Sequence, residues 1–423
     1  MVLKNIDNQK IKITTKEINK KNILRIIKNS SPISRIDIAS RLKISRPTVT
    51  AYIDELISER LVIEIGLGES TQLGGKKPRL LQFNNKANYI IGVKIGVRTT
   101  RAAITDLDAN IIEHSKTPTE EWSGPKVVID NLKGIISEVI KKSGISINKI
   151  IGIGIATTGL TDSENGVVVF SPNLFGWSNI PLVQIIENEF KIPTFIDNEC
   201  RVQAIAERFN GLARGINTFV CYYVGVGVGS GIFIDGEILR GRYRRGGEVG
   251  HITVVEDGVE CHCGNFGCLE TVASTKKLIK DVISRIKNDK ASSLYNKIKS
   301  EIPIEIEDIY EAYDQNETKV IEEVLKNANW VGVGIANTIK VIDPELVIIH
   351  GKVIPFGDKY LKVVEETVRK ITFPKVKQDF EIKFTQLGEM VGVIGASVMV
   401  FDKVFELNNI DISKEFVVKK EEF

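Results

Sequence analysis

The 423-residue sequence has little of what marks several classes of protein. Cysteine occurs only five times, about 1% of the chain, far below the content of a disulfide scaffold. No apolar run approaches the roughly 20 residues that a membrane-spanning helix needs, and the first residues lack the apolar core of a signal peptide. These absences argue against a membrane protein and a small secreted scaffold. We expect a cytoplasmic protein with no membrane partner.

The composition that is present is typical of a folded protein with more than one domain. Hydrophobic residues make up 43% and charged residues 26%, and roughly 150 residues per domain predicts two or three compact units. Residues 1–90 carry 17 basic and 8 acidic side chains, and the remaining residues carry 40 and 46. A basic end on an acidic body suits a protein that approaches a polyanion with one part only. A lysine-rich solvated face is the alternative.

Three short helices are predicted within the basic end. Residues 15–29 place isoleucines near helical spacing, and Ser34 followed by Asp37 is a capping pattern for a second helix that ends near Lys43. A third helix begins at Ser45 after a tight turn, the order of a helix-turn-helix, whose third helix enters the major groove by its N-terminal end. The predicted DNA-binding residues of this helix are Ser45, Arg46, Thr48 and Thr50.

A basic hairpin is predicted next. Residues 61–65 and 79–83 are strand-like, and the loop between them contains four glycines, Lys76 and Lys77. Glycines allow the backbone to approach DNA closely while lysines reach phosphate or the minor groove. The hairpin therefore resembles a wing in which Lys76 and Lys77 bind DNA. A small three-helix protein-interaction module is the alternative.

From residue 89, strand-like apolar runs that end in glycine alternate with helical segments, which predicts α/β architecture. The glycines at alternate positions from Gly225 to Gly231 are compatible with two interpretations. Their backbone N–H groups can face a phosphate, or they can simply permit close packing.

A cysteine cluster is the most specific motif in the chain. Cys261, Cys263 and Cys268 fall within eight positions, and Gly264 and Gly267 permit sharp turns between them. Three thiolates from one loop can occupy three corners of a Zn²⁺ tetrahedron. We predict a structural zinc ion held by these cysteines and by His251, ten residues upstream. His262 is the competing fourth ligand, although it is wedged between two others.

The order of these motifs resembles the ROK family of repressors, open reading frames and sugar kinases. A winged helix is followed by SPNLFGW, GGEVGH and CHCGNFGCLE, and SPISRIDIASRLKISRPTVT with GGKKP is similar to the xylose-repressor branch. The resemblance covers nearly the whole chain and implies an actin-like, two-lobed sugar-kinase body with the zinc loop beside a sugar pocket. The expected domains are a winged helix-turn-helix at 1–84, a first α/β lobe at 85–208 and a second lobe with the zinc loop at 209–423.

The resemblance also implies which residues contact a sugar. Carboxylates and amides suit this task because they pair with vicinal hydroxyl groups. His251 would serve twice, with one nitrogen on zinc and the other toward the sugar or a carboxylate. The matching positions are Asn173, Asn198, Glu199, Glu248, His251 and Glu270.

The chain departs from the kinases of the family at three points. The Asp-x-Gly-Gly-Thr phosphate loop is replaced by Lys94-Ile95-Gly96-Val97-Arg98, and Val226 replaces a threonine of the second loop. The catalytic aspartate of Asn-Asp-x-Asn is replaced by Glu199, one methylene longer. A cation where an acid helps to organise metal-bound phosphate should damage catalysis. We therefore predict no catalytic residues and no enzymatic activity.

These observations together predict a sugar-responsive transcriptional repressor. It binds operator double-stranded DNA through the winged helix, as a homodimer or a dimer of dimers, and a monosaccharide inducer, xylose or glucose, releases it from the operator. The alternative is an active ROK sugar kinase that phosphorylates an aldohexose with ATP.

Overall fold

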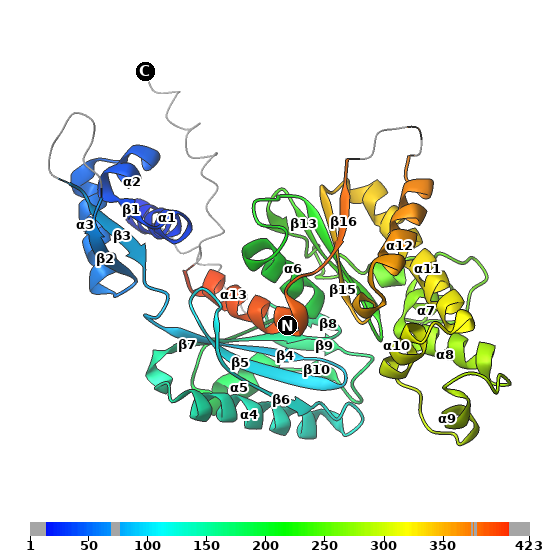
Figure 1. Cartoon of the computed structure of the whole chain (residues 1–423). Coiled ribbons are helices and arrows are strands. Elements are labelled where there is room, and N and C mark those ends of the chain that lie inside the picture. The colour runs from blue at the N-terminus through cyan, green and yellow to red at the C-terminus, as the bar shows by residue number, and fades with distance from the viewer. Residues whose placement is uncertain (1–13, 69–76, 374, 376–378, 406–423) are drawn as a thin grey trace, which may run out of the picture.

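The computed structural model describes residues 14–68, 77–373, 375 and 379–405. It contains an N-terminal head and a two-lobed α/β body (Figure 1). The head comprises α1 (Thr15–Ser30), β1 (Ile33–Ser34), α2 (Arg35–Leu42), α3 (Arg46–Ser58), β2 (Val62–Leu67) and β3 (Arg79–Phe83). Its small sheet has the order β1-β3-β2, with antiparallel pairing throughout. The predicted three helices and hairpin are confirmed.

The helices of the head begin where side chains satisfy free backbone N–H groups. Ser34 and Asp37 form a reciprocal capping box at the start of α2, which supplies partners for donors that a helix cannot satisfy itself. Lys43 then adopts a left-handed conformation, with φ of 53°, and ends the helix. The Ser45 hydroxyl accepts a hydrogen bond from the Thr48 N–H and starts α3.

The first lobe is built on a five-stranded sheet of order β11-β7-β4-β5-β6. The strands β11, β7 and β4 are parallel, whereas β5 and β6 continue from β4 as an antiparallel meander. Segments 89–210 form β4 (Tyr89–Ile95), β5 (Thr99–Asp106), β6 (Ile111–Pro118), α4 (Gly124–Ser143), η1 (Ile147–Lys149), β7 (Ile150–Thr157), β8 (Leu160–Asp162), β9 (Val167–Phe170), β10 (Ser178–Ile180), α5 (Leu182–Phe190), β11 (Thr194–Asn198) and α6 (Glu199–Asn210).

The second lobe repeats this sheet. Its order is β14-β13-β12-β15-β16, with β12, β15 and β16 parallel and β13 and β14 antiparallel. The remaining elements are β12 (Phe219–Val224), β13 (Val228–Ile234), β14 (Glu237–Ile238), η2 (Val249–His251), α7 (Glu270–Ala273), α8 (Thr275–Ile286), α9 (Tyr295–Lys299), α10 (Ile306–Asp314), α11 (Thr318–Ile342), β15 (Leu346–Gly351), η3 (Ile354–Phe356), α12 (Gly357–Ile371), β16 (Glu381–Phe384), η4 (Gly388–Met390) and α13 (Val391–Phe405). The repeated sheet confirms the two-lobed α/β body.

Two helices make contacts with both predicted lobes, whose boundaries remain a prediction. The last helix, α13, packs on β4 and β7 of the first lobe although it follows the second lobe in the chain. Gly154 allows this approach, since a Cβ there would lie 2.1 Å from the Ala396 carbonyl oxygen. The helix α6 packs on α13 and also on β12 and β13 of the second lobe. These two helices therefore connect the lobes.

The head is attached to the body by an apolar junction at the end of α13. The side chain of Phe401 makes an edge contact with Phe83 of the head at 6.0 Å. Lys28 of α1 lies 4.7 Å from the Phe83 ring and 4.5 Å from the Phe401 ring, and it donates a hydrogen bond to the Leu107 carbonyl. Lys28 also pairs with Asp108 of the first lobe. Head, first lobe and α13 thus share one core.

Within the described ranges, no helix combines the length and the apolar character needed to cross a bilayer.

Candidate functional site

The N-terminal end of α3 presents the predicted DNA-binding residues. Ser45 and Arg46 are exposed, and Thr48 and Thr50 are half-buried. The hydroxyls of Ser45 and Thr48 lie 2.6 Å apart and hydrogen-bond to each other while Ser45 caps the helix. A helix N-terminus with exposed hydroxyls and a guanidinium can bind phosphate oxygens or base edges. Lys77 is exposed at the base of the wing, and Lys76 lies outside the described residues.

An ion-pair network that the sequence analysis missed braces the wing against α3. Arg35 of α2 pairs with Asp54 of α3 at 2.8 Å and with Glu64 of β2 at 3.0 Å. Arg79 of β3 also pairs with Glu64 and lowers its pKa through a hydrogen bond. Opposite charges at positions 35 and 64 carry no local pattern, because only the folded head brings them together. The network fixes the angle between wing and recognition helix.

The cysteine loop gathers the four predicted metal ligands. The ligand atoms of His251, Cys261, Cys263 and Cys268 all lie within 4.8 Å of one another. His251 Nδ1 is 3.6 Å from Cys261 Sγ, and Cys263 Sγ is 3.7 Å from Cys268 Sγ. The loop turns sharply at Gly267, where φ is 65° and a Cβ would lie 1.7 Å from the Val255 carbonyl oxygen.

This geometry fits tetrahedral zinc. With Zn–S near 2.3 Å and Zn–N near 2.0 Å, ligand atoms should lie roughly 3.3–3.8 Å apart. The pairs His251–Cys261 and Cys263–Cys268 agree, at 3.6 and 3.7 Å. Burial raises the pKa of the Cys268 thiol to about 12, so a bound cation would be needed to keep it deprotonated at neutral pH. The residues present could therefore hold a metal ion.

His262 has another partner. Its Nδ1 lies 4.0 Å from Cys261 Sγ and only 3.0 Å from Glu270 Oε1. Cys261, His262 and Glu270 form a second group that could hold a metal. In this structure, however, His262 and Glu270 already pair with each other. This arrangement favours His251 as the fourth ligand, as predicted.

Several predicted sugar-contacting residues meet where the two lobes face each other. A Cβ at Gly227 of the second lobe would lie 2.6 Å from Glu270 Oε2 and 4.0 Å from the Asn173 amide nitrogen of the first lobe. Glu270 Oε2 also accepts a hydrogen bond of 2.8 Å from the Val228 N–H. Asn173 and Glu270 are therefore close neighbours across the lobes, and Gly227 leaves room between them.

Glu248 belongs to the same region. Its side chain is open to solvent, yet surrounding protein raises its pKa by desolvation, offset in part by His251 and Arg201 and reinforced by Glu270. An accessible carboxyl group with protein on most sides is typical of the floor of a binding site. Burial raises the pKa of the Cys200 thiol, and the charges of Glu199 and Glu248 raise it further, so Glu199 lies near Glu248. We refer to Asn173, Glu199, Glu248 and Glu270 as the interlobe site.

Both polar atoms of the Asn198 side chain form hydrogen bonds within the protein. Its side-chain oxygen accepts a hydrogen bond of 2.9 Å from the Cys200 N–H as the cap of α6, and its amide donates to the Gly159 carbonyl at 2.9 Å. The cap orients the first turn of α6 and hence Glu199. A direct contact between Asn198 and a sugar stays a prediction.

Two residues that depart from the kinase pattern form an ion pair. Lys94 Nζ lies 3.1 Å from Glu199 Oε2, and the two side chains are only 14% and 11% exposed. The cation that replaces the acid of the phosphate loop is thus bound to the carboxylate that replaces the catalytic aspartate. The sequence analysis identified both substitutions but not their contact.

The space around this pair is filled by side chains. Lys94 Nζ lies 5.4 Å from the centroid of the Tyr223 ring, and the Tyr223 hydroxyl would lie 2.5 Å from a Cβ at Gly225. In β13, a Cβ at Gly229 would lie 2.8 Å from Cys200 Sγ, and one at Gly231 would lie 2.3 Å from the Cys200 carbonyl oxygen. These contacts favour packing as the role of Gly229 and Gly231.

A buried aspartate of the first lobe forms ion pairs that connect the two lobes. Asp197 is fully buried and accepts from Arg201 Nε at 2.6 Å and from Arg240 Nη2 at 3.0 Å. Arg240 follows β14 of the second lobe, so the contact spans both lobes. Arg201 stands where the kinase pattern has asparagine, and the sequence analysis gave it no role.

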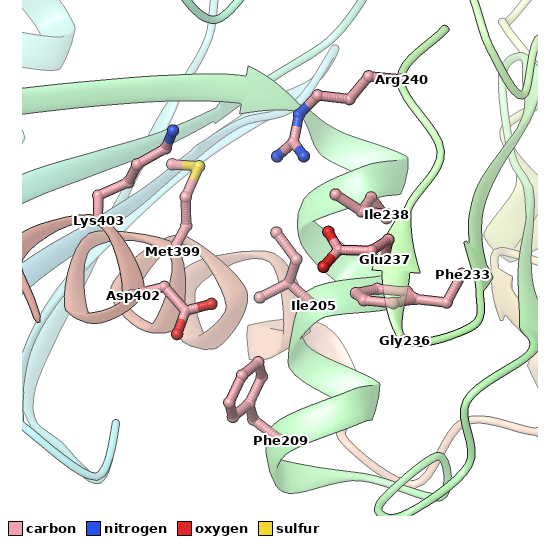
Figure 2. A pocket seen from close by; sticks show the side chains of 10 residues that line it. All are labelled: Ile205, Phe209, Phe233, Gly236, Glu237, Ile238, Arg240, Met399, Asp402 and Lys403. Atoms are coloured by element: carbon pink, nitrogen blue, oxygen red, sulfur yellow. The ribbon is translucent and has the colours of Figure 1, made fainter. Parts of the chain in front are cut away.

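A separate cavity of about 100 Å³ lies between α6, the β13–β14 hairpin and α13 (Figure 2). The carboxylates of Glu237 and Asp402 and the guanidinium of Arg240 are arranged around Ile205 in this view. Burial raises the pKa of Asp402 to about 7. The residues that line the cavity include none of the predicted sugar-contacting residues.

The body and head match known families and proteins. Residues 90–403 match the ROK family, and residues 16–63 match a winged helix-turn-helix DNA-binding domain. A xylose repressor from Caldicellulosiruptor bescii is 32% identical over 391 residues, covering 91% of this chain and 96% of the relative. A solved ROK family transcriptional regulator, a homologue of the Escherichia coli MLC protein, is 27% identical, with a TM-score of 0.79 over 93% of this chain and 98% of its own.

A glucokinase from Halalkalibacterium halodurans is 30% identical over 313 residues, which is 74% of this chain and 94% of the enzyme. The regulators therefore match nearly the whole chain, whereas the kinase leaves about a quarter of it unmatched. The match of residues 90–403, together with the repeated sheets, the cysteine loop and the winged head, shows that the chain belongs to the ROK family.

Proposed function

We propose that this protein is a transcriptional repressor that binds operator DNA through α3 and the wing and leaves the operator when a monosaccharide binds at the interlobe site. The observation that carries the proposal is the ion pair between Lys94 and Glu199 in a body that bears a DNA-binding head. A lysine paired with Glu199, which stands where the kinases have their catalytic aspartate, opposes phosphoryl transfer, which needs free carboxylates for metal and proton. The body then retains sugar recognition without catalysis.

The relatives support the choice of ligand and partner. The proteins that match nearly the whole chain include the xylose repressor and the ROK transcriptional regulator. We therefore propose operator double-stranded DNA as the partner, xylose or glucose as the inducer, and the cytoplasm as the location. A homodimer is proposed because two heads on a pseudo-palindromic operator double the footprint.

Zinc completes the proposal. We assign structural Zn²⁺ to His251, Cys261, Cys263 and Cys268, with His251 Nδ1 toward the ion. When bound, the ion would link η2 to the cysteine loop and so hold the segment that carries Glu248. The other nitrogen of His251 would remain available to a sugar hydroxyl or carboxylate.

Sugar release of DNA requires that the sugar bind one arrangement of the lobes more tightly than another. The structure offers a path for this coupling. The helix α6 begins at Glu199 in the interlobe site and packs on α13, whose far end contacts the head. Movement between the lobes would therefore change the contact between α13 and the head. By linkage, operator DNA must weaken sugar binding by the same factor as sugar weakens DNA binding.

One set of measurements tests the proposal. Operator sequences would be selected from genomic fragments by the purified protein, and their affinity measured with and without xylose and glucose. The proposal expects weaker DNA binding with one of these sugars, and no ADP release when Mg-ATP and the same sugars are supplied. Sugar-dependent ADP release would instead establish the kinase alternative.

A further inference from the structure

We infer that Lys94 is a positioning residue of the interlobe site, whose ammonium group serves as a built-in counter-cation for Glu199. Sugar binding would then require neither nucleotide nor a divalent metal at this position. The inference rests on the proposed function, because it assumes that a sugar binds beside Glu199. It concerns how the carboxylate is held, which neither the family match nor the relatives specify.

Three contacts hold the Lys94 side chain in place. Lys94 Nζ lies 3.1 Å from Glu199 Oε2 and 5.4 Å from the centroid of the Tyr223 ring. The aliphatic stem lies on Gly392 at the start of α13, where a Cβ would come within 2.6 Å of Lys94 Cδ. A lysine held by a carboxylate, an aromatic ring and a helix backbone has little freedom to leave.

The neighbouring cations are committed elsewhere. Arg201, two residues after Glu199, donates to Asp197 at 2.6 Å, and Arg240 donates to the other oxygen of Asp197 at 3.0 Å. Lys94 is thus the cation that the described part of the chain pairs with Glu199. Because both partners are almost buried, removing either leaves the other charge poorly solvated.

The pair leaves one carboxylate oxygen for a ligand. Oε2 of Glu199 faces Lys94, whereas Oε1 has no hydrogen-bond or ion-pair partner within the described ranges. A carboxylate held by a cation at one oxygen can accept a sugar hydroxyl at the other. A metal ion would come and go with its nucleotide, but a tethered ammonium is always present, so Glu199 is prepared for the sugar in advance.

Calorimetric sugar titrations of the full-length protein test the inference by chemical rescue. Lys94→Ala should weaken the binding of the inducing sugar by about tenfold or more, and ethylammonium chloride should restore most of the loss by entering the space left by the side chain. Tetramethylammonium chloride, which cannot donate a hydrogen bond, should not. Wild-type affinity should be the same with and without Mg-ATP.

The matched control is Lys133→Ala, which breaks a surface pair with Glu189 of 2.8 Å and should leave sugar affinity unchanged. If Lys94→Ala unfolds, the double variant Lys94→Met/Glu199→Gln removes both charges and should bind the sugar weakly, with no effect of ethylammonium. Wild-type affinity in either Lys94 variant, or a sugar affinity that depends on Mg-ATP, would overturn the inference. If the wild-type protein binds no sugar, the proposed function itself fails.

Discussion

The two lobes of the body share one sheet topology but carry different parts of the site. In the first lobe, only α4 and the short η1 separate β6 from β7, and the start of β4 packs against the head. In the second lobe, residues 239–345 separate β14 from β15 and contain the cysteine loop and α7 to α11. The repeated sheet provides the scaffold, and the segments inserted into it provide the chemistry.

The sheets meet through equivalent positions. Lys94 is the penultimate residue of β4, and Tyr223 is the penultimate residue of β12, the corresponding strand of the second lobe. The Lys94 ammonium lies 5.4 Å from the centroid of the Tyr223 ring. The two equivalent strands of the repeated sheets therefore bring these two side chains together between the lobes.

The largest expected effect is in the second lobe, where a change in the cysteine loop should leave the head unaffected. Cys268→Ser should reduce bound zinc from about one ion per chain to almost none, because a structural site depends on all four ligands. Elemental analysis measures the zinc, and hydrogen exchange should show lost protection around residues 249–273 while the head stays protected. Cys221→Ala, at a buried cysteine outside the loop, is the control. Stoichiometric zinc in Cys268→Ser would refute the ligand assignment.

The second prediction tests how much the junction between the head and the body contributes to stability. Phe401 is 3% exposed, so Phe401→Ala should reduce the free energy of unfolding by about 3–5 kcal/mol, measured by denaturant titration. Val404→Ala, one turn away and 40% exposed, should change it by less than about 0.5 kcal/mol. Equal effects of the two variants would contradict the junction described here.

A smaller effect is expected at the DNA interface. Arg46→Ala should weaken operator binding by about 1–3 kcal/mol if its guanidinium reads a base. Lys77→Ala should weaken binding to all sequences alike and reduce the slope of log affinity against log salt by about one. Fluorescence anisotropy at several salt concentrations distinguishes them. An unchanged slope for Lys77→Ala would remove this residue from the interface.

The smallest effect concerns Asp402 in the cavity between the lobes. Burial raises its pKa to about 7, so the folded protein binds a proton more tightly than the unfolded chain does, and this group lowers stability as the pH rises from about 4 to 7. Asp402→Asn should therefore stabilise the protein at pH 8, because the amide has no charge that burial penalises. The gain should be on the order of 1 kcal/mol, less than the full pKa shift implies, because an amide keeps only part of the interactions that the Asp402 carboxylate makes. No gain is expected at pH 4. A gain that does not change between pH 4 and pH 8 would contradict the shift.

The sequence predicted the local features of the molecule well. Capping residues such as Ser34 and Ser45 act within one helical turn, and three cysteines in one loop are near each other whatever the rest of the chain does. The contacts it missed join distant residues. Lys94 and Glu199, or Arg35 and Glu64, meet only after strands and helices have packed.

The position of α13 was also beyond local patterns. The sequence analysis did not identify the helix at Val391–Phe405, and neither periodicity nor spacing indicates that this segment returns to the first lobe. The glycines of β4 and β7 that admit it, including Gly154, serve a neighbour more than 200 residues away.

The junction at Phe401 has a consequence for biosynthesis. Phe83 leaves the ribosome long before Phe401, and at roughly 5–20 residues per second the interval lasts tens of seconds. During that time the nascent head would lack the aromatic partner that seats it. A chain that ends before Phe401 would lack the contact between the head and α13. Control by sugar would therefore begin only once translation is complete.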